Sequence, residues 1–191
     1  MMPSRFPDEV AGEFQPPPID FEDGEDRHIQ IRVYDESGAE YEALVEMYDA
    51  FDPADRAQGI PPTRPEEIRR WLDSILDEDC YNVIAWHNDA VAGHATLVPA
   101  DDAHYELAIF VHQDYQEAGI GTRLIRSLLG HGQESGVETV WLTVERWNRA
   151  AVGLYEKIGF ETSDAESFEI EMVLRLNETD GSGSAASDEN G

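Results

Sequence analysis

Residues 116–121 read Gln-Glu-Ala-Gly-Ile-Gly, and they follow an apolar run, Leu-Ala-Ile-Phe-Val, at residues 107–111. The hexad also opens an amphipathic stretch that predicts a helix over 120–134. A glycine-bearing turn from a strand into a helix leaves several backbone N–H groups unpaired at the positive end of the helix dipole. Because Gly119 and Gly121 have no Cβ, a phosphate can come close to that backbone. The hexad therefore predicts a site for a phosphorylated cofactor.

The hexad differs from the two commoner phosphate motifs. The sequence has no G-x-x-x-x-G-K-[ST], which excludes a P-loop, and the hexad is not the G-x-G-x-x-G of dinucleotide-binding folds. It does fit the pattern [RQ]-x-x-G-x-[GA], with Gln116, Gly119 and Gly121 in the three defined places. Glycine-rich turns also occur in ordinary βα units, so the hexad alone leaves a purely structural turn as the alternative.

A second segment, residues 137–160, predicts a strand followed by a helix. Apolar residues alternate over 138–145, as they do in a buried strand. Asn148 is a candidate N-cap for the helix, and Gly159 suits the position just after its end. The helix and its exit carry the sequence Leu-Tyr-Glu-Lys-Ile-Gly-Phe at 154–160.

Together the two segments resemble the GNAT superfamily of N-acetyltransferases. The hexad is similar to the acetyl-CoA pyrophosphate loop of that family, and residues 137–160 are similar to its second cofactor-binding segment. A looser resemblance extends over 28–176. The resemblance implies an α/β (α+β) GNAT fold: a mixed, mostly antiparallel central sheet with splayed central strands and helices on both faces.

Periodicity and turn residues predict an element order that matches this plan. Strands are expected near 28–34, 81–87, 91–98, 104–112, 138–145, 159–163 and 167–176, and helices near 37–50, 65–78, 120–134 and 148–157. Asn88, Asp89 and Gly93 mark a tight hairpin region between the second and third strands. The acidic, polar stretches 1–27 and 177–191 predict disordered tails, which leaves 28–176 as the folded domain.

The resemblance implies a set of cofactor-binding residues. The strand residues Ile109, Phe110 and Val111 would hold the pantetheine arm through their backbone groups, while their side chains can serve simply as core. The other contacts are implied for the loop, the helix that follows it and the second segment: Gln116, Glu117, Ala118, Gly119, Ile120, Gly121, Thr122, Arg123, Asn148 and Tyr155. Glu117 departs from the family, which often has Gly or a small residue after the Gln or Arg. A carboxylate beside a pyrophosphate is unfavourable unless it points outward or salt screens it.

Acetyl transfer from a thioester to an amine needs a neutral amine, a stabilised oxyanion, a protonated thiolate and aligned reactants. Tyr155 stands where the family's leaving-group acid stands, and a phenol with a pKa of ~10 can protonate a thiolate with a pKa of ~8.5. Glu106 stands where the protein-lysine acetyltransferase branch has its general base, which would act through a water relay. The alternatives are that Tyr155 only packs and that Glu106 has no catalytic duty. Likewise, Asn148 could be a plain N-cap, and Arg123 could lie on a solvated helix face.

The stretch 51–65 is long and interrupted by prolines, which is too irregular for a strand. In the GNAT family the segment between the first two helices borders the acceptor pocket. By that resemblance, residues 51–65 are the candidate substrate loop. A rigid surface connector is the alternative.

The composition of the 191-residue chain is strongly acidic. The net charge is −28, and Lys157 is the only lysine. Such a surface repels nucleic acid and anionic membranes, so neither is an expected partner. Scarce lysine with abundant Asp and Glu resembles proteins of extreme halophiles, in which molar salt screens the repulsion between like charges. We therefore expect the fold to loosen in dilute buffer.

The numbers and spacing of cysteine, histidine and apolar residues argue against a thiol nucleophile, a metal site and a membrane span. Cys80 is the only cysteine, and its acidic neighbours at 77–79 favour a buried structural thiol over a nucleophile. The six histidines have no metal-ligand spacing, so no metal is expected. The sequence has no long apolar span and no leader-like start, which predicts a soluble, cytoplasmic protein.

The function implied by the resemblance is an acetyl-CoA-dependent N-acetyltransferase that transfers acetyl directly to a primary amine in a ternary complex. A protein lysine or N-terminal amine is slightly favoured by the position of Glu106, and a small-molecule amine is the close alternative. An acidic surface would attract cationic acceptors of either kind. The resemblance also allows a homodimer. From another class, the rival is a non-catalytic acyl-CoA-binding sensor, which would need neither Tyr155 nor Glu106.

Overall fold

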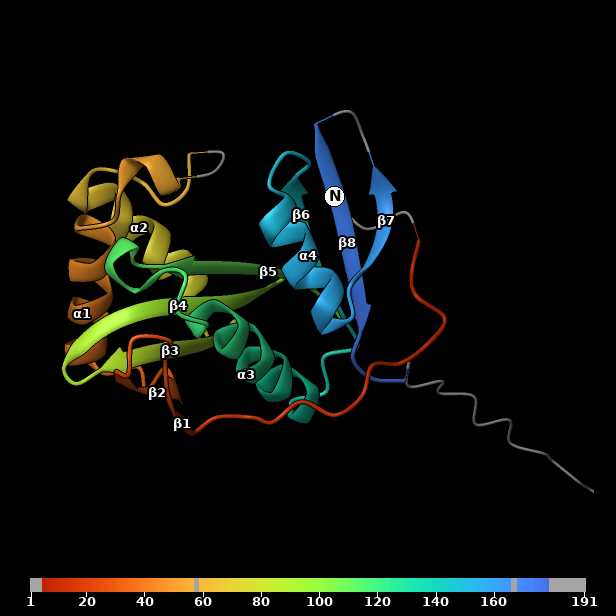
Figure 1. The fold of residues 1–191 in the computed structure, drawn as a ribbon, viewed down its shortest axis with the longest axis horizontal. Helices are drawn as coiled ribbons and strands as arrows, with labels where there is room; N and C mark the ends of the chain where they lie inside the picture. Colours follow the sequence, from red (N-terminus) through yellow and green to blue (C-terminus); the bar gives the residue numbers. More distant parts are fainter. Residues whose placement is uncertain (1–4, 57–58, 166–167, 179–191) are drawn as a thin grey trace, which may run out of the picture.

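The computed structural model describes residues 5–56, 59–165 and 168–178. In these ranges eight strands form one sheet in the order β1-β2-β3-β4-β5-β6-β8-β7 (Figure 1). The strands are β1 (Ile19–Glu22), β2 (His28–Val33), β3 (Tyr81–His87), β4 (Ala90–Pro99), β5 (His104–Val111), β6 (Thr139–Glu145), β7 (Glu161–Ala165) and β8 (Glu169–Arg175). The helices are α1 (Gly38–Asp49), α2 (Pro65–Ile75), α3 (Ile120–Glu134) and α4 (Arg149–Ile158), with short 3-10 turns η1 (Pro53–Asp55) and η2 (Gln113–Tyr115).

The predicted element order is confirmed, with small shifts at the ends. The helix predicted over 120–134 is α3, and Asn88 with Asp89 forms the two-residue turn between β3 and β4. Asn88 adopts a positive φ of 55°, as tight hairpin turns require. Gly93 lies inside β4 instead of in the turn. A Cβ there would come within 3.0 Å of the Phe110 carbonyl oxygen, so close packing of β4 against β5 requires glycine.

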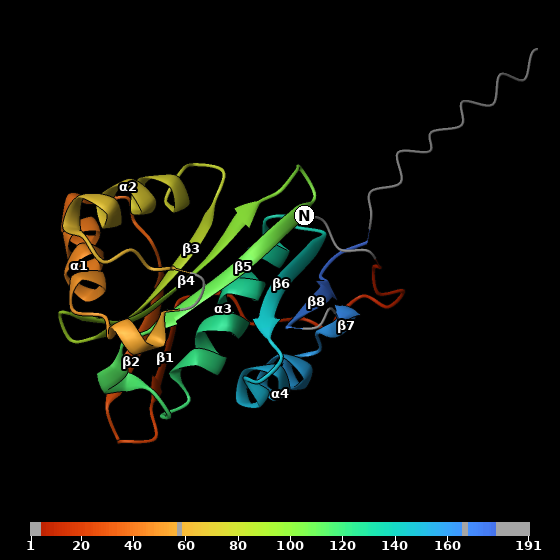
Figure 2. The same ribbon diagram turned by 90° about the horizontal axis from the view of Figure 1, so that it is seen from above.

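Helices cover both faces of the sheet, as Figure 2 shows: α1 and α2 lie on one face, and α3 and α4 lie on the other. Side chains of a strand alternate between faces, and this alternation separates two cores. On β5, Ile109 packs with the core that contains Leu124 of α3, while Phe110 packs with the core that contains Leu44 of α1. Residues of β5 therefore contribute to both layers.

Strands β5 and β6 pair over only a short length. All neighbouring strands are antiparallel except this parallel pair. Its register ends at the pair Glu106–Trp141, although β5 stays paired with β4 as far as Val111. Beyond that point the two strands diverge (Figure 1). The facing edges of β5 and β6 consequently carry backbone groups that no strand pairs, which is the predicted splay.

The predicted disorder of residues 1–27 is wrong for much of this segment. Residues 19–22 form β1, which pairs with β2, and the residues before them run along α3 (Figure 1). The Ala11 N–H donates to the Arg175 carbonyl at 2.8 Å, and the Phe14 N–H donates to Gln133 Oε1 at 3.0 Å. The acidic composition obscured the few apolar side chains that attach the segment to the core: Phe14, Ile19 and Phe21.

The C-terminal boundary is tested only at its start. Asn177 donates its side-chain amide to the carbonyls of Gln133 and Val137, so the fold continues through this residue. The predicted tail beyond 178 lies outside the described residues. In the described part of the chain, no helix is long and apolar enough to cross a bilayer.

Candidate functional site

The predicted phosphate loop connects β5 to α3 through the turn η2. Gly119 is the N-cap of α3 and has a left-handed φ of 85°, and Glu117 has a φ of 59°. The Gly119 cap provides no side chain, so the first N–H groups of α3 remain available to a ligand. The geometry is that of a helix-terminal anion site.

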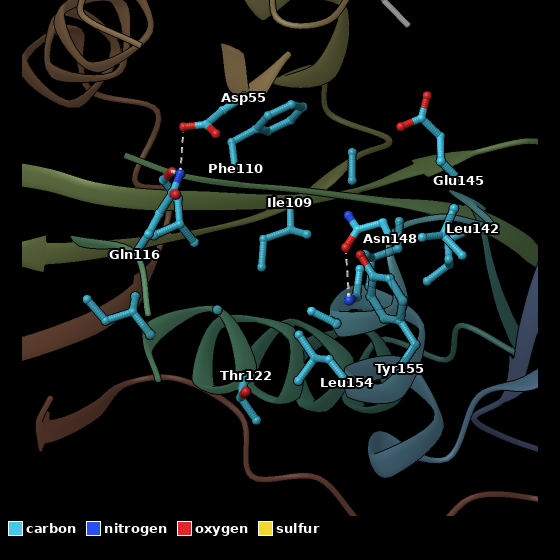
Figure 3. A pocket seen from close by; sticks show the side chains of 18 of the residues that line it. Asp55, Ile109, Phe110, Gln116, Thr122, Leu142, Glu145, Asn148, Leu154 and Tyr155 are labelled. Atoms are coloured by element: carbon cyan, nitrogen blue, oxygen red, sulfur yellow. Dashed lines mark hydrogen bonds between the residues drawn. The ribbon is translucent and has the colours of Figure 1, made fainter. Parts of the chain in front are cut away.

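A cavity of about 670 Å³ extends from this loop along the gap between β5 and β6 to the start of α4 (Figure 3). It brings together most of the residues predicted from the sequence: Glu106, Ile109, Phe110, Val111, Gln116, Glu117, Gly119, Ile120, Gly121, Thr122, Asn148 and Tyr155. The anion site, the unpaired strand edges and both predicted catalytic residues therefore share one cavity.

Two predicted contacts lie outside the cavity lining. Ala118 is buried, and its carbonyl accepts from the Gly24 N–H at 2.9 Å. The Arg123 guanidinium lies 4.9 Å from the centre of the Phe21 ring. Phe21 belongs to β1, so the expectation of a disordered N-terminus concealed the partner that holds Arg123 on this side of α3.

Tyr155 projects from α4 toward the gap between the strands (Figure 3). The residue is buried, and its ring packs against Phe160 with the ring centres 5.7 Å apart. Desolvation raises the pKa of the Tyr155 hydroxyl to about 12. The hydroxyl therefore keeps its proton at neutral pH.

Asn148 caps the helix that carries Tyr155. Its Oδ1 accepts from the Ala151 N–H at 3.2 Å, the dashed contact beside α4 in Figure 3. Capping occupies the oxygen and leaves the Nδ2 group to a ligand in the cavity. The two predicted roles, N-cap and cofactor contact, are therefore compatible in one side chain.

Glu106 is the last residue of β5 that pairs with β6. On a strand it faces the same side as Phe110, toward α1 and α2. Its side chain is exposed at the cavity, yet desolvation by the atoms around it raises the pKa of the carboxyl above the ordinary value. A raised pKa makes the carboxylate a stronger base.

The sequence profile of the acetyltransferase (GNAT) family matches residues 42–160, which include the loop, the splayed strands and α4. The chain belongs to the GNAT family. Its fold agrees with solved GNAT structures: the GNAT domain of S. lividans PAT superposes with a TM-score of 0.68 at 15% identity, covering 83% of this chain and 97% of that one. A putative acetyltransferase from Salmonella typhimurium, solved with its cofactor acetyl-CoA, has a TM-score of 0.61 at 18% identity, covering 80% and 96%.

Among curated sequences, the chain is similar to the [ribosomal protein bS18]-alanine N-acetyltransferase of Escherichia coli K12. The two are 44% identical over 52 residues, which is 27% of this chain and 35% of the relative. The chain thus spans about a third of the length of this curated relative.

Several residues of this GNAT cavity belong to no motif in the sequence. Segment 51–65, predicted as the substrate loop, contributes Phe51, Asp55 and Ile60 to the lining, and β6 contributes Glu145. Nothing in the spacing of these residues marks them. Asp55 reaches the cavity because η1 contacts the phosphate loop, and Glu145 reaches it as the last residue of β6; both depend on tertiary structure.

The Gln116 side chain explains how that packing is held. Its Nε2 donates to the Asp55 carboxylate at 2.8 Å and to the Val111 carbonyl at 3.0 Å (Figure 3). The amide nitrogen of Gln116 is therefore bonded to the predicted substrate loop and to β5, which leaves the backbone N–H groups of the phosphate loop as the donors for an anion.

The charges around the cavity are negative. Four carboxylates line it, and neither lysine nor arginine is among the described residues that do so: the acids are Asp55, Glu106, Glu117 and Glu145. An anionic ligand must rely on backbone N–H groups and on the dipole of α3. A cationic group is attracted by the same lining.

The remaining sequence hypotheses concern metal and thiol chemistry. Within the described residues, no three His, Cys, Asp or Glu side chains are grouped so that they could hold a metal ion. Cys80 is half-buried, and desolvation together with Asp77 and Asp79 raises the pKa of its thiol. A raised pKa disfavours the thiolate, in agreement with a structural role for Cys80.

Proposed function

We propose that this chain is an acetyl-CoA-dependent N-acetyltransferase that transfers acetyl directly to a primary amine. The observation that carries the proposal is the single cavity that joins the start of α3, which has no side-chain cap, the unpaired edges of β5 and β6, and the hydroxyl of Tyr155. A binding protein would need the first two features. The placement of Tyr155 and Glu106 in the same cavity supports transfer chemistry.

The binding site divides along the cavity. The pyrophosphate would contact the N–H groups of residues 117–121, and the pantetheine arm would pair with the unpaired backbone of Ile109 and Val111. Asn148 would donate its Nδ2 to the same arm. Apart from Asn148, these contacts come from backbone groups on rigid elements. They would fix the thioester carbon against the amine without a flexible lysine or arginine side chain.

The proposed reaction uses the two titratable groups in sequence. Glu106 takes a proton from the acceptor ammonium through a water, and the neutral amine attacks the thioester carbonyl carbon. The C–N bond forms, the nitrogen of the tetrahedral intermediate loses its second proton to water, and the C–S bond breaks as the intermediate collapses to the amide. Tyr155 then gives its proton to the departing thiolate of coenzyme A. A backbone N–H of β5 supports the oxyanion.

For the acceptor we propose a protein amine, either an N-terminal amine or a lysine. The name of the Escherichia coli relative supports an N-terminal amine, since that enzyme is an alanine N-acetyltransferase of a ribosomal protein. The position of Glu106 supports a lysine. The acidic lining around Asp55 and Glu106 suits the positive charge of either group.

The test is coenzyme A release with acetyl-CoA and a panel of N-terminal peptides, lysine peptides and polyamines. We expect Tyr155→Phe to lower kcat by about 10²–10⁴-fold, which is the usual loss of a general acid. The dissociation constant of acetyl-CoA should stay unchanged. Tyr34→Phe is the matched control, because Tyr34 lies outside the cavity. An unchanged kcat in Tyr155→Phe would remove the acid from the mechanism.

Glu106 has a test in the pH profile. A base must be unprotonated, so kcat/KM should rise with pH through the pKa of Glu106, and that rise should lie above the range of an ordinary carboxyl because the pKa is raised. Glu106→Gln should remove the rise. If kcat/KM of both proteins follows the same pH profile, Glu106 is not the base.

The acyl-CoA sensor is the rival function. Calorimetry would then give tight acetyl-CoA binding, while no amine of the panel releases coenzyme A above the background rate. Turnover with any acceptor class contradicts the sensor.

A further inference from the structure

The wall of the cavity opposite α4 comes from the segment between α1 and α2. Phe51 is buried and Asp55 is exposed, and both line the cavity. Between them runs η1, a single turn whose own residues are all exposed. Its internal support is local: the Asp52 carboxylate caps the turn by accepting from the Ala54 N–H at 2.9 Å. Such a short exposed turn needs outside contacts to keep one position.

Two glutamines on the opposite side supply those contacts. Gln113 donates its Nε2 to the Ala50 carbonyl at 2.7 Å and accepts the Asp52 N–H on its Oε1 at 3.1 Å. Gln116 donates to the Asp55 carboxylate at 2.8 Å. Both glutamines belong to the stretch that joins β5 to α3, which is the phosphate loop and its approach.

We propose that Gln113 and Gln116 are positioning residues that fasten the acceptor wall to the cofactor loop. This inference rests on the proposed function, because the wall faces an acceptor only if the cavity carries out the transfer. Gln113 has the cleaner role, since it is not among the residues that line the cavity. Its amide bonds the backbone on both sides of Phe51 and so sets where Phe51 and Asp55 stand.

The contacts of Gln113 and Gln116 with the acceptor wall have a thermodynamic consequence. Acetyl-CoA that orders the loop also orders the wall through the glutamines, and so raises the affinity for the acceptor. By linkage, an acceptor that orders the wall raises the affinity for acetyl-CoA by the same factor. Removal of the Gln113 contacts should therefore weaken acceptor binding and reduce this mutual effect. It should leave the anion site of α3 in place, because Gln113 provides none of the backbone groups there.

The test is Gln113→Ala in the full chain, with the best acceptor from the amine panel. We expect the KM of the acceptor to rise about tenfold, as the loss of two hydrogen bonds of moderate strength predicts. The KM of acetyl-CoA and kcat should stay within about twofold of wild type under the same reasoning. Gln30→Ala is the matched control, because it removes a glutamine–aspartate contact, Gln30 Nε2 to Asp20 Oδ1, at the far edge of the sheet. An unchanged acceptor KM overturns the proposal.

Hydrogen exchange provides a readout that needs no acceptor. In Gln113→Ala the amides of residues 50–56 should exchange faster than in wild type, while those of α3 stay as they are. In wild type, acetyl-CoA should slow exchange at 50–56, and the variant should lose this effect. If residues 50–56 exchange equally in both proteins, the proposal that Gln113 holds the wall is refuted. If wild type releases no coenzyme A with any amine, but wild type and Gln113→Ala still differ in exchange at 50–56, the proposed function fails. The contact between wall and loop is then supported on its own.

Discussion

At the scale of single residues, the most informative group outside the cavity is a buried chain of hydrogen bonds in which every donor and acceptor is determined. Asn82 donates its Nδ2 to the Ile75 carbonyl at 2.8 Å, so its Oδ1 must accept from His94 Nε2, also at 2.8 Å. His94 Nδ1 is then the acceptor for the Tyr48 hydroxyl at 2.6 Å. This chain of hydrogen bonds fixes the tautomer of His94 and links α1, β3, β4 and the end of α2.

This chain of hydrogen bonds predicts how stability depends on pH. Burial lowers the pKa of His94 to about 3, against 6.5 for the free side chain. Between these values the unfolded chain binds a proton that the folded chain refuses, so the free energy of unfolding falls as pH falls, by up to ~1.4 kcal/mol per pH unit. His94→Gln should be less stable than wild type at pH 7.5, and the gap should shrink by pH 5. Urea unfolding at both pH values measures this, and a constant gap would refute it.

At the scale of elements, the N-terminal segment runs alongside α3 for much of the helix (Figure 1). Gly130 makes this contact possible, because a Cβ there would lie 2.7 Å from the backbone of Gln15 and Pro16. Gly153 of α4 is the matched case, since a Cβ there would meet nothing within 4 Å. Each glycine lies within a helix, where alanine is otherwise favoured.

Two substitutions separate helix propensity from packing. Gly153→Ala should stabilise the fold by up to ~1 kcal/mol, which is the helix preference for alanine. Gly130→Ala gains the same preference but must displace backbone, at a cost of ~1–3 kcal/mol, so its net effect should be destabilising. Thermal unfolding of the two variants is the measurement. A stabilised Gly130→Ala would mean that the N-terminal segment does not contact α3.

Much of this architecture was predictable from the sequence, because strong periodicity and clear caps marked the elements. Asn148 at the start of α4 and the glycines at the start of α3 stood in readable patterns. β1 was not predictable, since four residues among many acids carry no periodic signal. Arg123 was assigned to the cofactor from its place just after the loop, and its contact with Phe21 could not be foreseen because Phe21 belongs to β1. Segment 51–65 was predicted as the substrate loop, but the place of Asp55 in the lining depends on long-range contacts of η1.

At the scale of the whole molecule, charge dominates. The formal net charge is −28, and the described ion pairs involve few of the acids. Two pairs include a buried carboxylate: Arg27 lies 2.7 Å from Asp23, and Arg32 lies 3.5 Å from Glu40. The pair of Arg69 with Glu42 leaves both partners accessible to solvent, where ion pairs contribute little to stability. We propose that this surface is adapted to molar salt.

Salt should therefore stabilise the protein. Raising KCl from 0.1 M to 1 M shortens the screening length from ~10 Å to ~3 Å, so repulsion between surface carboxylates fades. We expect the thermal midpoint to rise steeply over that range and more slowly above it. Sucrose at equal osmolality is the control, because it leaves the charges unscreened. Equal shifts in KCl and sucrose would contradict an electrostatic cause.

The course of the N-terminal segment also orders events during synthesis. The ribosome makes residues 11–15 early, yet their partners are Gln133 of α3 and Arg175 at the end of β8. Its contact with Arg175 cannot form until β8 has emerged from the exit tunnel. The hairpin of β1 and β2, in contrast, pairs with residues made within moments of one another. The segment is thus translated before both of its partners and docks only after β8 has been made.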